Sequence, residues 1–255
     1  MTPTPLRLDA ELPTDALRDR VILVTGASRG LGRAIALDCA RRGARTLLAG
    51  RDVRRLEAVA DEIEALAAPE PVIVPINLEG ASLDDYTTLA TLVAERCGRL
   101  DGLVLNAAML GEICGIETSD PVLWARVFQV NVHSPYLMVR ALLPLLRQAE
   151  AASIIATSSG VGRQGRALWG AYAASKHALE GLMQVLADEL RGVSTVRINS
   201  LNPGRTRTRM RAQAYPAEDP ATLPAPEEIA PFFVQLLTGR DGFHGEALEI
   251  ALDKS

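Results

Sequence analysis

The chain has few of the residues that hold metal ions or disulfide bridges. Its cysteines are Cys39, Cys97 and Cys114, which are widely separated and form no C-x-x-C pair, and its three histidines have no ligand spacing. No zinc or other metal site is therefore expected. Scattered cysteines of odd number are typical of reduced, buried thiols, so we expect a cytoplasmic protein.

Long hydrophobic runs and an excess of positive charge are also absent. Every apolar run is too short to span a bilayer, and the formal net charge of −4 leaves no general basic surface for nucleic acid. Neither a membrane nor a nucleic acid is expected as a partner. Residues 1–19 are polar and contain three prolines, so we interpret them as a loose N-terminal arm rather than a signal peptide.

Residues 20–255 fit one α/β domain in which strands and helices alternate. The apolar runs predict strands at 21–25, 46–49, 72–76, 101–106, 153–157, 195–201 and 248–250. The intervening stretches predict helices at 33–42, 54–67, 83–96, 121–131, 135–148, 171–191 and near 227–238. This alternation predicts a doubly wound parallel sheet, Rossmann-like and three-layered as α/β/α. The segment 204–225 is rich in Arg, Thr and Pro and is interpreted as a flap.

A glycine-rich turn follows the first predicted strand of the domain. The segment 26–32 reads Gly-Ala-Ser-Arg-Gly-Leu-Gly and precedes a predicted helix. Glycines in this context let the backbone approach a pyrophosphate, whose charge the helix N-terminus stabilises. The alternative is an ordinary strand–helix turn, but such a turn does not need three glycines in seven residues.

A tyrosine and a lysine four residues apart point to acid–base chemistry. Tyr172 and Lys176 share one face of the predicted helix 171–191. A neighbouring ammonium favours the phenolate and is expected to lower the tyrosine pKa, as a general acid/base for a carbonyl/alcohol couple requires. The spacing by itself is also compatible with a packed ring and a solvated amine.

Two further polar residues lie where predicted strands end. Ser159 follows the strand 153–157, and Asn106, with Ala107 and Ala108 after it, ends the strand 101–106. Ligands of open parallel sheets bind beyond the carboxyl ends of the strands, where a serine hydroxyl can hydrogen-bond a substrate oxygen. Ser158 and Ser159 could alternatively be turn residues that cap the strand.

Together these motifs resemble the short-chain dehydrogenase/reductase family, in its single-domain branch. The resemblance covers roughly residues 20 to 250 and is strongest to a group of bacterial oxidoreductases, through residues 161–170 and 205–208. It implies that Tyr172 is the acid, Lys176 binds the nicotinamide ribose, and Ser159, thirteen residues before the tyrosine, polarises the carbonyl. Asn131 would anchor a water in the proton relay. The cofactor-binding residues it implies are Gly26, Ser28, Arg29, Gly30, Leu31, Gly32, Arg51, Asn77, Leu78, Asn106, Ala107, Ala108, Tyr172, Lys176, Pro203, Gly204, Thr206 and Thr208.

The residues after the second strand favour NADP(H) over NAD(H). NAD-dependent relatives place a carboxylate there for the ribose 2′-hydroxyl, whereas this chain has Gly50 followed by Arg51. Arg29 in the glycine turn adds a second guanidinium, and guanidinium groups accommodate a 2′-phosphate well. The alternative is that both arginines are solvated surface cations. Asp52 is expected to cap the next helix.

The expected function is hydride transfer between NADP(H) and a small-molecule carbonyl or secondary alcohol. A 3-oxoacyl thioester reductase and a non-catalytic NADP(H)-binding regulator are the alternatives; a nucleotide-sugar epimerase would need another glycine motif and a larger substrate region. The resemblance also implies a homodimer or homotetramer. Apolar residues on the helices 121–148 and 171–191 exceed what one buried face requires, which supports this expectation: Leu142, Leu145, Leu179, Leu182 and Leu186.

Overall fold

A computed structural model describes residues 2–8 and 12–252. The strands are β1 (Thr4–Leu6), β2 (Val21–Thr25), β3 (Arg45–Gly50), β4 (Val72–Pro75), β5 (Gly102–Leu105), β6 (Ser153–Thr157), β7 (Arg197–Asn202) and β8 (Glu246–Ile250). The helices are α1 (Gly30–Arg41), α2 (Val53–Glu64), α3 (Leu83–Cys97), α4 (Pro121–Phe128), α5 (Ser134–Leu146), α6 (Gly170–Leu190), α7 (Arg209–Ala214) and α8 (Pro226–Thr238).

The strands form one parallel sheet in the order β1-β8-β7-β6-β5-β2-β3-β4. The chain runs outward in one direction through β2, β3 and β4, and then returns to the other side of β2 at β5. The carboxyl ends of β2 and β5 therefore flank the point where the strand order reverses, which is where open α/β sheets bind ligands. The predicted doubly wound, Rossmann-like fold is confirmed.

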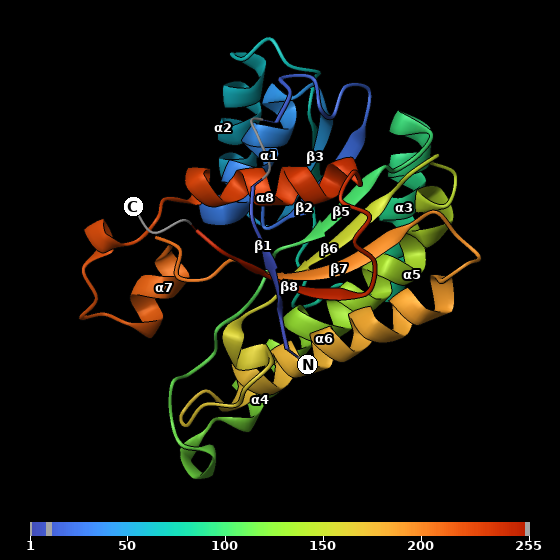
Figure 1. Cartoon of the computed structure of the whole chain (residues 1–255). Coiled ribbons are helices and arrows are strands. Elements are labelled where there is room, and N and C mark those ends of the chain that lie inside the picture. Colours follow the sequence, from blue (N-terminus) through green and yellow to red (C-terminus); the bar gives the residue numbers. More distant parts are fainter. Residues whose placement is uncertain (1, 9–11, 253–255) are drawn as a thin grey trace.

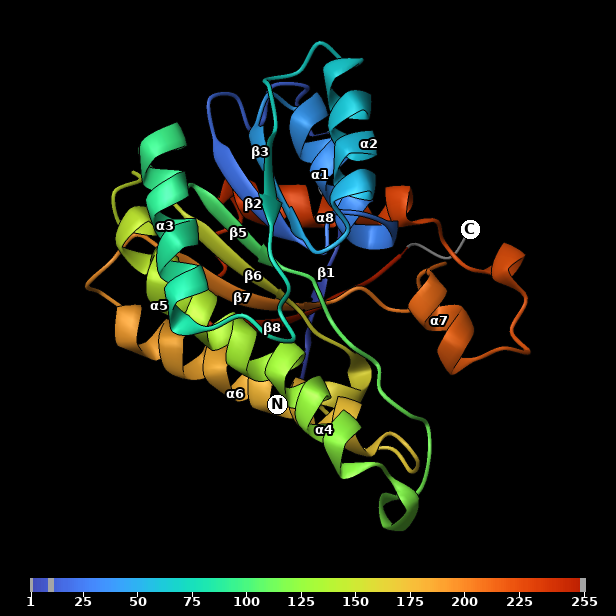
Figure 2. The ribbon, with the colours of Figure 1, turned by 180° about the vertical axis from the view of Figure 1, so that it is seen from behind.

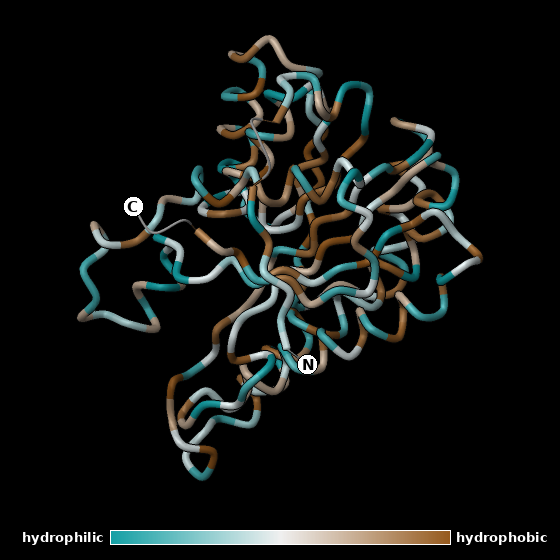
Figure 3. The backbone as a smooth tube through the Cα atoms, in the orientation of Figure 1, coloured by the Kyte–Doolittle hydropathy of each residue, from teal (hydrophilic) through white to brown (hydrophobic). Residues whose placement is uncertain are grey.

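Helices cover both faces of the sheet, as Figures 1 and 2 show. Helices α1, α2 and α8 bury their apolar side chains against one face, and α3, α5 and α6 bury theirs against the other. The central strands carry much of the hydrophobic colour in Figure 3. Strand β2 is buried at every position, as expected of a parallel strand that is covered on both faces.

The N-terminal segment differs from the loose arm expected at residues 1–19. Residues Thr4–Leu6 form β1, which pairs in parallel with β8 at the edge of the sheet, and Leu6 is buried. Leu17 is also fully buried, and its amide donates to the carbonyl of Arg42 at 3.0 Å. The sequence did not predict this strand because proline normally argues against one: Pro5 cannot donate a hydrogen bond and is tolerated only at a sheet edge. Residues 1 and 9–11 of the expected arm lie outside the described residues.

The leucines expected to form an oligomer surface are instead part of the chain's own core. Leu182 is partly buried in the hydrophobic cluster that includes α5 and α6. The other four are fully part of that cluster: Leu142, Leu145, Leu179 and Leu186. The expectation fails because a helix that packs on a sheet and also on neighbouring helices buries apolar residues on more than one of its faces. The exposed apolar side chains on these helices are different ones: Val122 on α4, Tyr136 on α5 and Val185 on α6.

Among the described residues, no helix combines the length and hydropathy needed to cross a membrane. Within the same ranges, no three His, Cys, Asp or Glu side chains gather as metal ligands would. All three cysteines carry free thiols, and Cys39 is buried.

Candidate active site

The glycine turn packs tightly at the carboxyl ends of β2 and β5. Gly26 has a φ of +68°. A side chain at Gly32 would collide with the carbonyl oxygen of Gly26 and with the side-chain Nδ2 of Asn106. Asn106 donates through Nδ2 to the carbonyl of Thr25 at 3.0 Å, and its own amide donates to the Thr25 hydroxyl at 2.9 Å. Ala107 also donates to that hydroxyl, at 3.0 Å. These bonds fix the turn against β5, so Asn106 is held by the protein itself.

Helix α1 begins at this turn with an open N-terminus. Arg29 is its N-cap residue, makes no capping bond through its side chain, and is followed by no acidic residue in the first turn. Free amides at a helix N-terminus attract phosphate oxygens. Leu31 is buried, while Ser28 and Gly30 are half-buried. The turn therefore offers a cradle that fits a pyrophosphate.

Arginines gather around Arg29 beyond the end of β3. Burial is the main cause that lowers the pKa of Arg29. The positive charges of Arg209, Arg55 and Arg51 lower it further. Asp52, which pairs with Arg55 at 3.1 Å, acts in the opposite direction. The four arginines still outnumber this carboxylate, so they form an electropositive patch that would suit an anion. Gly50 supplies no carboxylate there.

Arg51 is not simply solvated. It forms an ion pair with Glu79, whose other oxygen accepts from Arg126 at 2.6 Å. The Asn77 side chain accepts from the amide of Glu79 at 3.3 Å and is otherwise exposed. Leu78 packs against the core beneath it. The expected helix cap is present too, since Asp52 accepts from the amide of Arg55 at 3.3 Å.

Tyr172 and Lys176 lie one turn apart on α6 and are both buried. The Lys176 Nζ donates to the carbonyl oxygen of Thr157 at 2.6 Å and lies 5.7 Å from the centroid of the Tyr172 ring. Thr157 ends β6, so this bond ties α6 to the strand that precedes Ser159. The two side chains share a helix face, as predicted.

The expectation that Lys176 lowers the pKa of Tyr172 is wrong, because burial moves that pKa in the other direction. Burial raises the pKa of Tyr172 to about 12, and the neighbouring Ser159 hydroxyl acts in the opposite direction. Burial lowers the pKa of Lys176 to about 8, against the attraction of Glu180. Depth of burial does not follow from the spacing of the two residues, and at this depth desolvation dominates the pKa of the phenol.

Ser159 and Asn131 border the same region from two other elements. Ser159 is the extended N-cap residue of the short 3₁₀ turn Gly160–Gly162, directly after β6. Asn131 lies in the π-helical turn Gln129–His133, which joins the two helices predicted at 121–131 and 135–148. Its amide bonds the backbone of Met109 in both directions, at 2.8 and 2.9 Å, and donates to the Ser175 hydroxyl at 3.0 Å. A π-helical turn is frequent at functional sites.

The flap brings Thr208 over the glycine turn. Thr208 is the N-cap residue of α7, accepts from the amide of Arg211 at 3.2 Å, and has its methyl group next to Gly30. Thr206 is buried and donates to the carbonyl of Pro203 at 3.2 Å. Gly204 donates to the Asn202 side chain at 3.1 Å. Figure 1 shows α7 and its flanking loops extending away from the sheet.

Sequence reasoning missed an aromatic cluster beside Tyr172. Trp169 meets Tyr172 edge-on with ring centroids 5.9 Å apart, and Tyr215 of the flap lies 5.7 Å from Trp169. Arg166 donates to the Tyr215 hydroxyl at 2.6 Å, and the Arg211 guanidinium lies 3.7 Å from the centroid of the same ring. No sequence pattern pairs position 215 with position 169, because only the folded flap brings them together.

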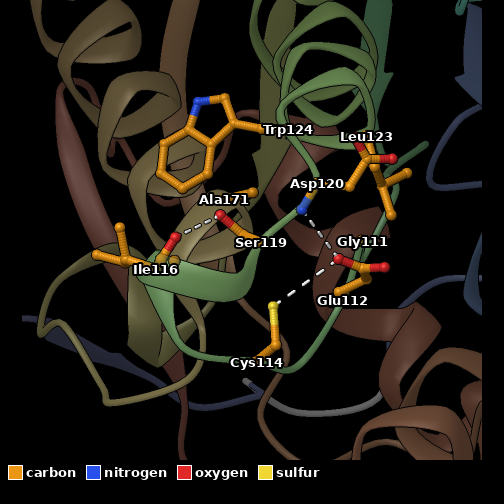
Figure 4. A pocket seen from close by; sticks show the side chains of 10 residues that line it. Gly111, Glu112, Cys114, Ile116, Ser119, Asp120, Leu123, Trp124 and Ala171 are labelled. Atoms are coloured by element: carbon orange, nitrogen blue, oxygen red, sulfur yellow. Dashed lines mark hydrogen bonds between the residues drawn. The ribbon is translucent and has the colours of Figure 1, made fainter.

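A small pocket lies between the 109–120 loop, α4 and the first residues of α6 (Figure 4). Gly170 and Ala171 contribute to its wall together with Trp124. The Glu112 carboxylate accepts from the Cys114 thiol at 3.8 Å and from the amide of Asp120 at 3.3 Å, which folds the loop back on itself.

Comparison with known proteins identifies the family. The short chain dehydrogenase family model matches residues 20–219. The chain belongs to the short-chain dehydrogenase/reductase family. It is 47% identical to the oxidoreductase YciK of Escherichia coli K12, over 88% of each chain, which is the bacterial type that residues 161–170 and 205–208 resemble.

Solved structures of this family agree. A short chain dehydrogenase from Pseudomonas syringae superposes with a TM-score of 0.92 at 49% identity, over 95% of this chain and 99% of that one. One from Escherichia coli CFT073 complexed with NADPH gives a TM-score of 0.90 at 46% identity, over 93% and 98%. The protein is therefore an oxidoreductase of this family, as the sequence predicted.

Proposed function

We propose that this oxidoreductase binds NADP(H) and reduces a small carbonyl compound to a secondary alcohol, with Tyr172 as the general acid. The structural relative complexed with NADPH supports the cofactor. So do the guanidinium groups of Arg29 and Arg51 beside Gly50, where a carboxylate for the 2′-hydroxyl is missing. NAD(H) carries no 2′-phosphate, so it would gain less binding energy from these guanidinium groups.

The residues at the turn and flap fit this cofactor. The backbone of the 26–32 turn and the α1 N-terminus would hold the pyrophosphate, and the arginine patch would hold the 2′-phosphate. Asn77 and Leu78 would border the adenine, and Lys176 the ribose. Residues at the ends of β5 and β7 would border the rest of the nicotinamide half: Asn106, Ala107, Ala108, Pro203, Gly204, Thr206 and Thr208.

Each catalytic side chain has one task in this mechanism. The nicotinamide, when bound, supplies the hydride for the carbonyl carbon. Tyr172 donates its phenolic proton to the carbonyl oxygen, and Ser159 orients that oxygen through its hydroxyl. Lys176 holds a positive charge beside the phenol, which stabilises the phenolate left after proton transfer. Asn131 anchors the adjoining helix and would position water for reprotonation.

The observation that carries the proposal is the convergence of Tyr172, Lys176 and Ser159: the phenol is buried beside the Lys176 Nζ, 5.7 Å from the ring centroid, and next to the Ser159 hydroxyl. Burial raises the pKa of Tyr172 to about 12, so the phenol keeps its proton at neutral pH, and the charge of Lys176 would have to stabilise the phenolate as the proton leaves. Trp169 and Leu110 belong to the same buried cluster as Tyr172. A residue that only bound the cofactor would not require such a proton donor.

A panel assay tests the proposal. NADPH oxidation is followed at 340 nm with ketones, aldehydes, quinones and a 3-oxoacyl thioester. Tyr136→Phe is the matched control for Tyr172→Phe, because Tyr136 is exposed on α5. We expect turnover with at least one carbonyl class in the wild type and the control. Turnover of the thioester alone would assign the alternative reductase activity. Tight NADPH binding without any turnover would contradict the proposal and favour a cofactor-binding regulator.

A further inference from the structure

A carboxylate is buried beneath the catalytic pair with a complete set of donors. Glu180 is 6% exposed and lies one turn after Lys176 on α6. Its Oε1 accepts from the Ser158 hydroxyl at 2.5 Å and from Arg163 Nε at 3.0 Å, and its Oε2 accepts from the Ser200 hydroxyl at 2.5 Å. A buried charge with three donors and an opposite charge is an ordered arrangement rather than a solvated surface residue.

The donors belong to the turn that carries Ser159. Side chains alternate along an extended strand, so Ser158 points towards Glu180 while Ser159 points to the side of Tyr172. Arg163 closes the same turn, and its NH2 group also donates to the carbonyl of Leu248 on β8 at 3.0 Å. The Glu180 carboxylate thus bonds the residue before Ser159 and a residue after it.

Close backbone packing reinforces this attachment. A side chain at Gly162 would collide with the Cβ and backbone of Lys176. The turn therefore rests directly on the stretch of α6 that carries Lys176, and the Glu180–Arg163 ion pair fastens it one turn further along. Shifting the ion pair would move the Ser159 turn relative to the helix that holds Tyr172.

The electrostatic surroundings of Lys176 point to Glu180 as its counter-charge. Burial lowers the pKa of Lys176 and the Glu180 charge raises it. The other charged groups that face Glu180 are Arg163, after the turn, and Glu246 of β8, which borders the same small cavity. Glu246 accepts from the Thr4 hydroxyl at 2.9 Å. It is not among the groups that shift the pKa of Lys176.

We propose that Glu180 is a positioning residue for the carbonyl reduction, which locks the Ser159 turn onto α6 and supplies the counter-charge for the ammonium of Lys176, one helical turn away. The importance of this role for turnover rests on the proposed function. The two structural effects do not, because they exist in the protein without substrate.

The chain offers a direct measurement, because it contains only two lysines, Lys176 and Lys254. In protein labelled with ¹³C-lysine, the Cε signals report the titration of each amine, and Lys176→Arg assigns them. We expect the Lys176 midpoint to fall by at least about half a pH unit in Glu180→Gln. The Lys254 midpoint should stay constant, as should that of Lys176 in the matched control Glu246→Gln.

Hydrogen exchange of residues 158–163 measures the locking of the turn. It should speed up at least about tenfold in Glu180→Gln, with residues 26–32 unchanged. Because that variant leaves Arg163 buried and unpaired, Arg163→Met combined with Glu180→Gln removes both charges and is tested in parallel. We expect both readouts to change in the double variant too.

Two results would overturn the proposal. A Lys176 midpoint within about 0.2 units of the wild type in a folded variant would remove the electrostatic role. Unchanged exchange at residues 158–163 would remove the positioning role. Failure to find a carbonyl substrate would contradict the proposed function but would leave both measurements intact.

Discussion

Lys176 and Tyr172 lie one helical turn apart, with the Lys176 Nζ 5.7 Å from the centroid of the phenol ring. Burial is the main influence on both groups, and it moves their pKa values in opposite directions, to about 8 for the amine and about 12 for the phenol. The phenol therefore keeps its proton at neutral pH, and its donation depends on a neighbouring positive charge to stabilise the phenolate.

The depressed pKa of Lys176 has a consequence for stability. Between pH 8 and its usual value of 10.5, the unfolded chain binds the proton more tightly than the folded one, so stability from this residue rises with pH. The free energy of unfolding of the wild type, relative to Lys176→Met, should increase by about 2 kcal/mol from pH 8 to pH 10. Urea denaturation at both pH values measures it. An equal difference at both would show that the amine titrates normally.

The arginine patch should set cofactor preference. Arg51→Ala should weaken NADPH binding roughly ten- to a hundredfold, as expected for a lost charge-assisted phosphate contact, and should leave NADH binding nearly unchanged. Glu79→Gln should act in the opposite direction, because it removes the carboxylate that now competes for Arg51. Fluorescence titrations with both cofactors provide the dissociation constants, with Arg54→Ala as the control. Equal losses for NADH and NADPH would contradict the assignment.

The flap 204–225 should close over the bound cofactor. Thr208 already lies beside Gly30, and Tyr215 packs on Trp169. Hydrogen exchange across the flap should therefore slow when NADPH is added, and Tyr215→Ala should reduce that protection. If NADPH protects residues 26–32 and leaves the flap unchanged, the segment is only a surface loop.

The protein should be a homodimer or homotetramer. Family resemblance places the interface on α4, α5 and α6, where Val122, Tyr136 and Val185 are 68%, 48% and 58% exposed. Val185→Glu should shift the molar mass from light scattering towards the monomer, whereas Val193→Glu, in the loop after α6, should not. A strict monomer of the wild type at micromolar concentration would refute this expectation.

Much of the fold was predictable from local patterns. The buried strand 21–25, the glycine turn and the paired Tyr172 and Lys176 each follow from short-range periodicity and turn chemistry. Strand β1 was not predictable, because three residues with a proline carry no alternation and pair only with a strand more than 240 positions away. Its position depends on tertiary contacts.

The electrostatics of the site were predictable only in part. Glu180, four residues after Lys176 on the same helix face, was a visible signal, whereas its partners Arg163 and Ser200 come from other elements. The pKa of Tyr172 could not be judged, because depth of burial is a property of the folded chain. The Tyr215–Trp169 contact likewise depends on how the flap folds back.

The central claim is that Tyr172 donates the proton during NADPH-dependent carbonyl reduction. The most direct test compares wild type and Tyr172→Phe for NADPH affinity by fluorescence and for single-turnover reduction of the best carbonyl substrate from the panel. The account predicts NADPH binding within about twofold of the wild type and a rate lower by roughly a hundred- to ten-thousandfold. A near-normal rate in Tyr172→Phe would contradict it.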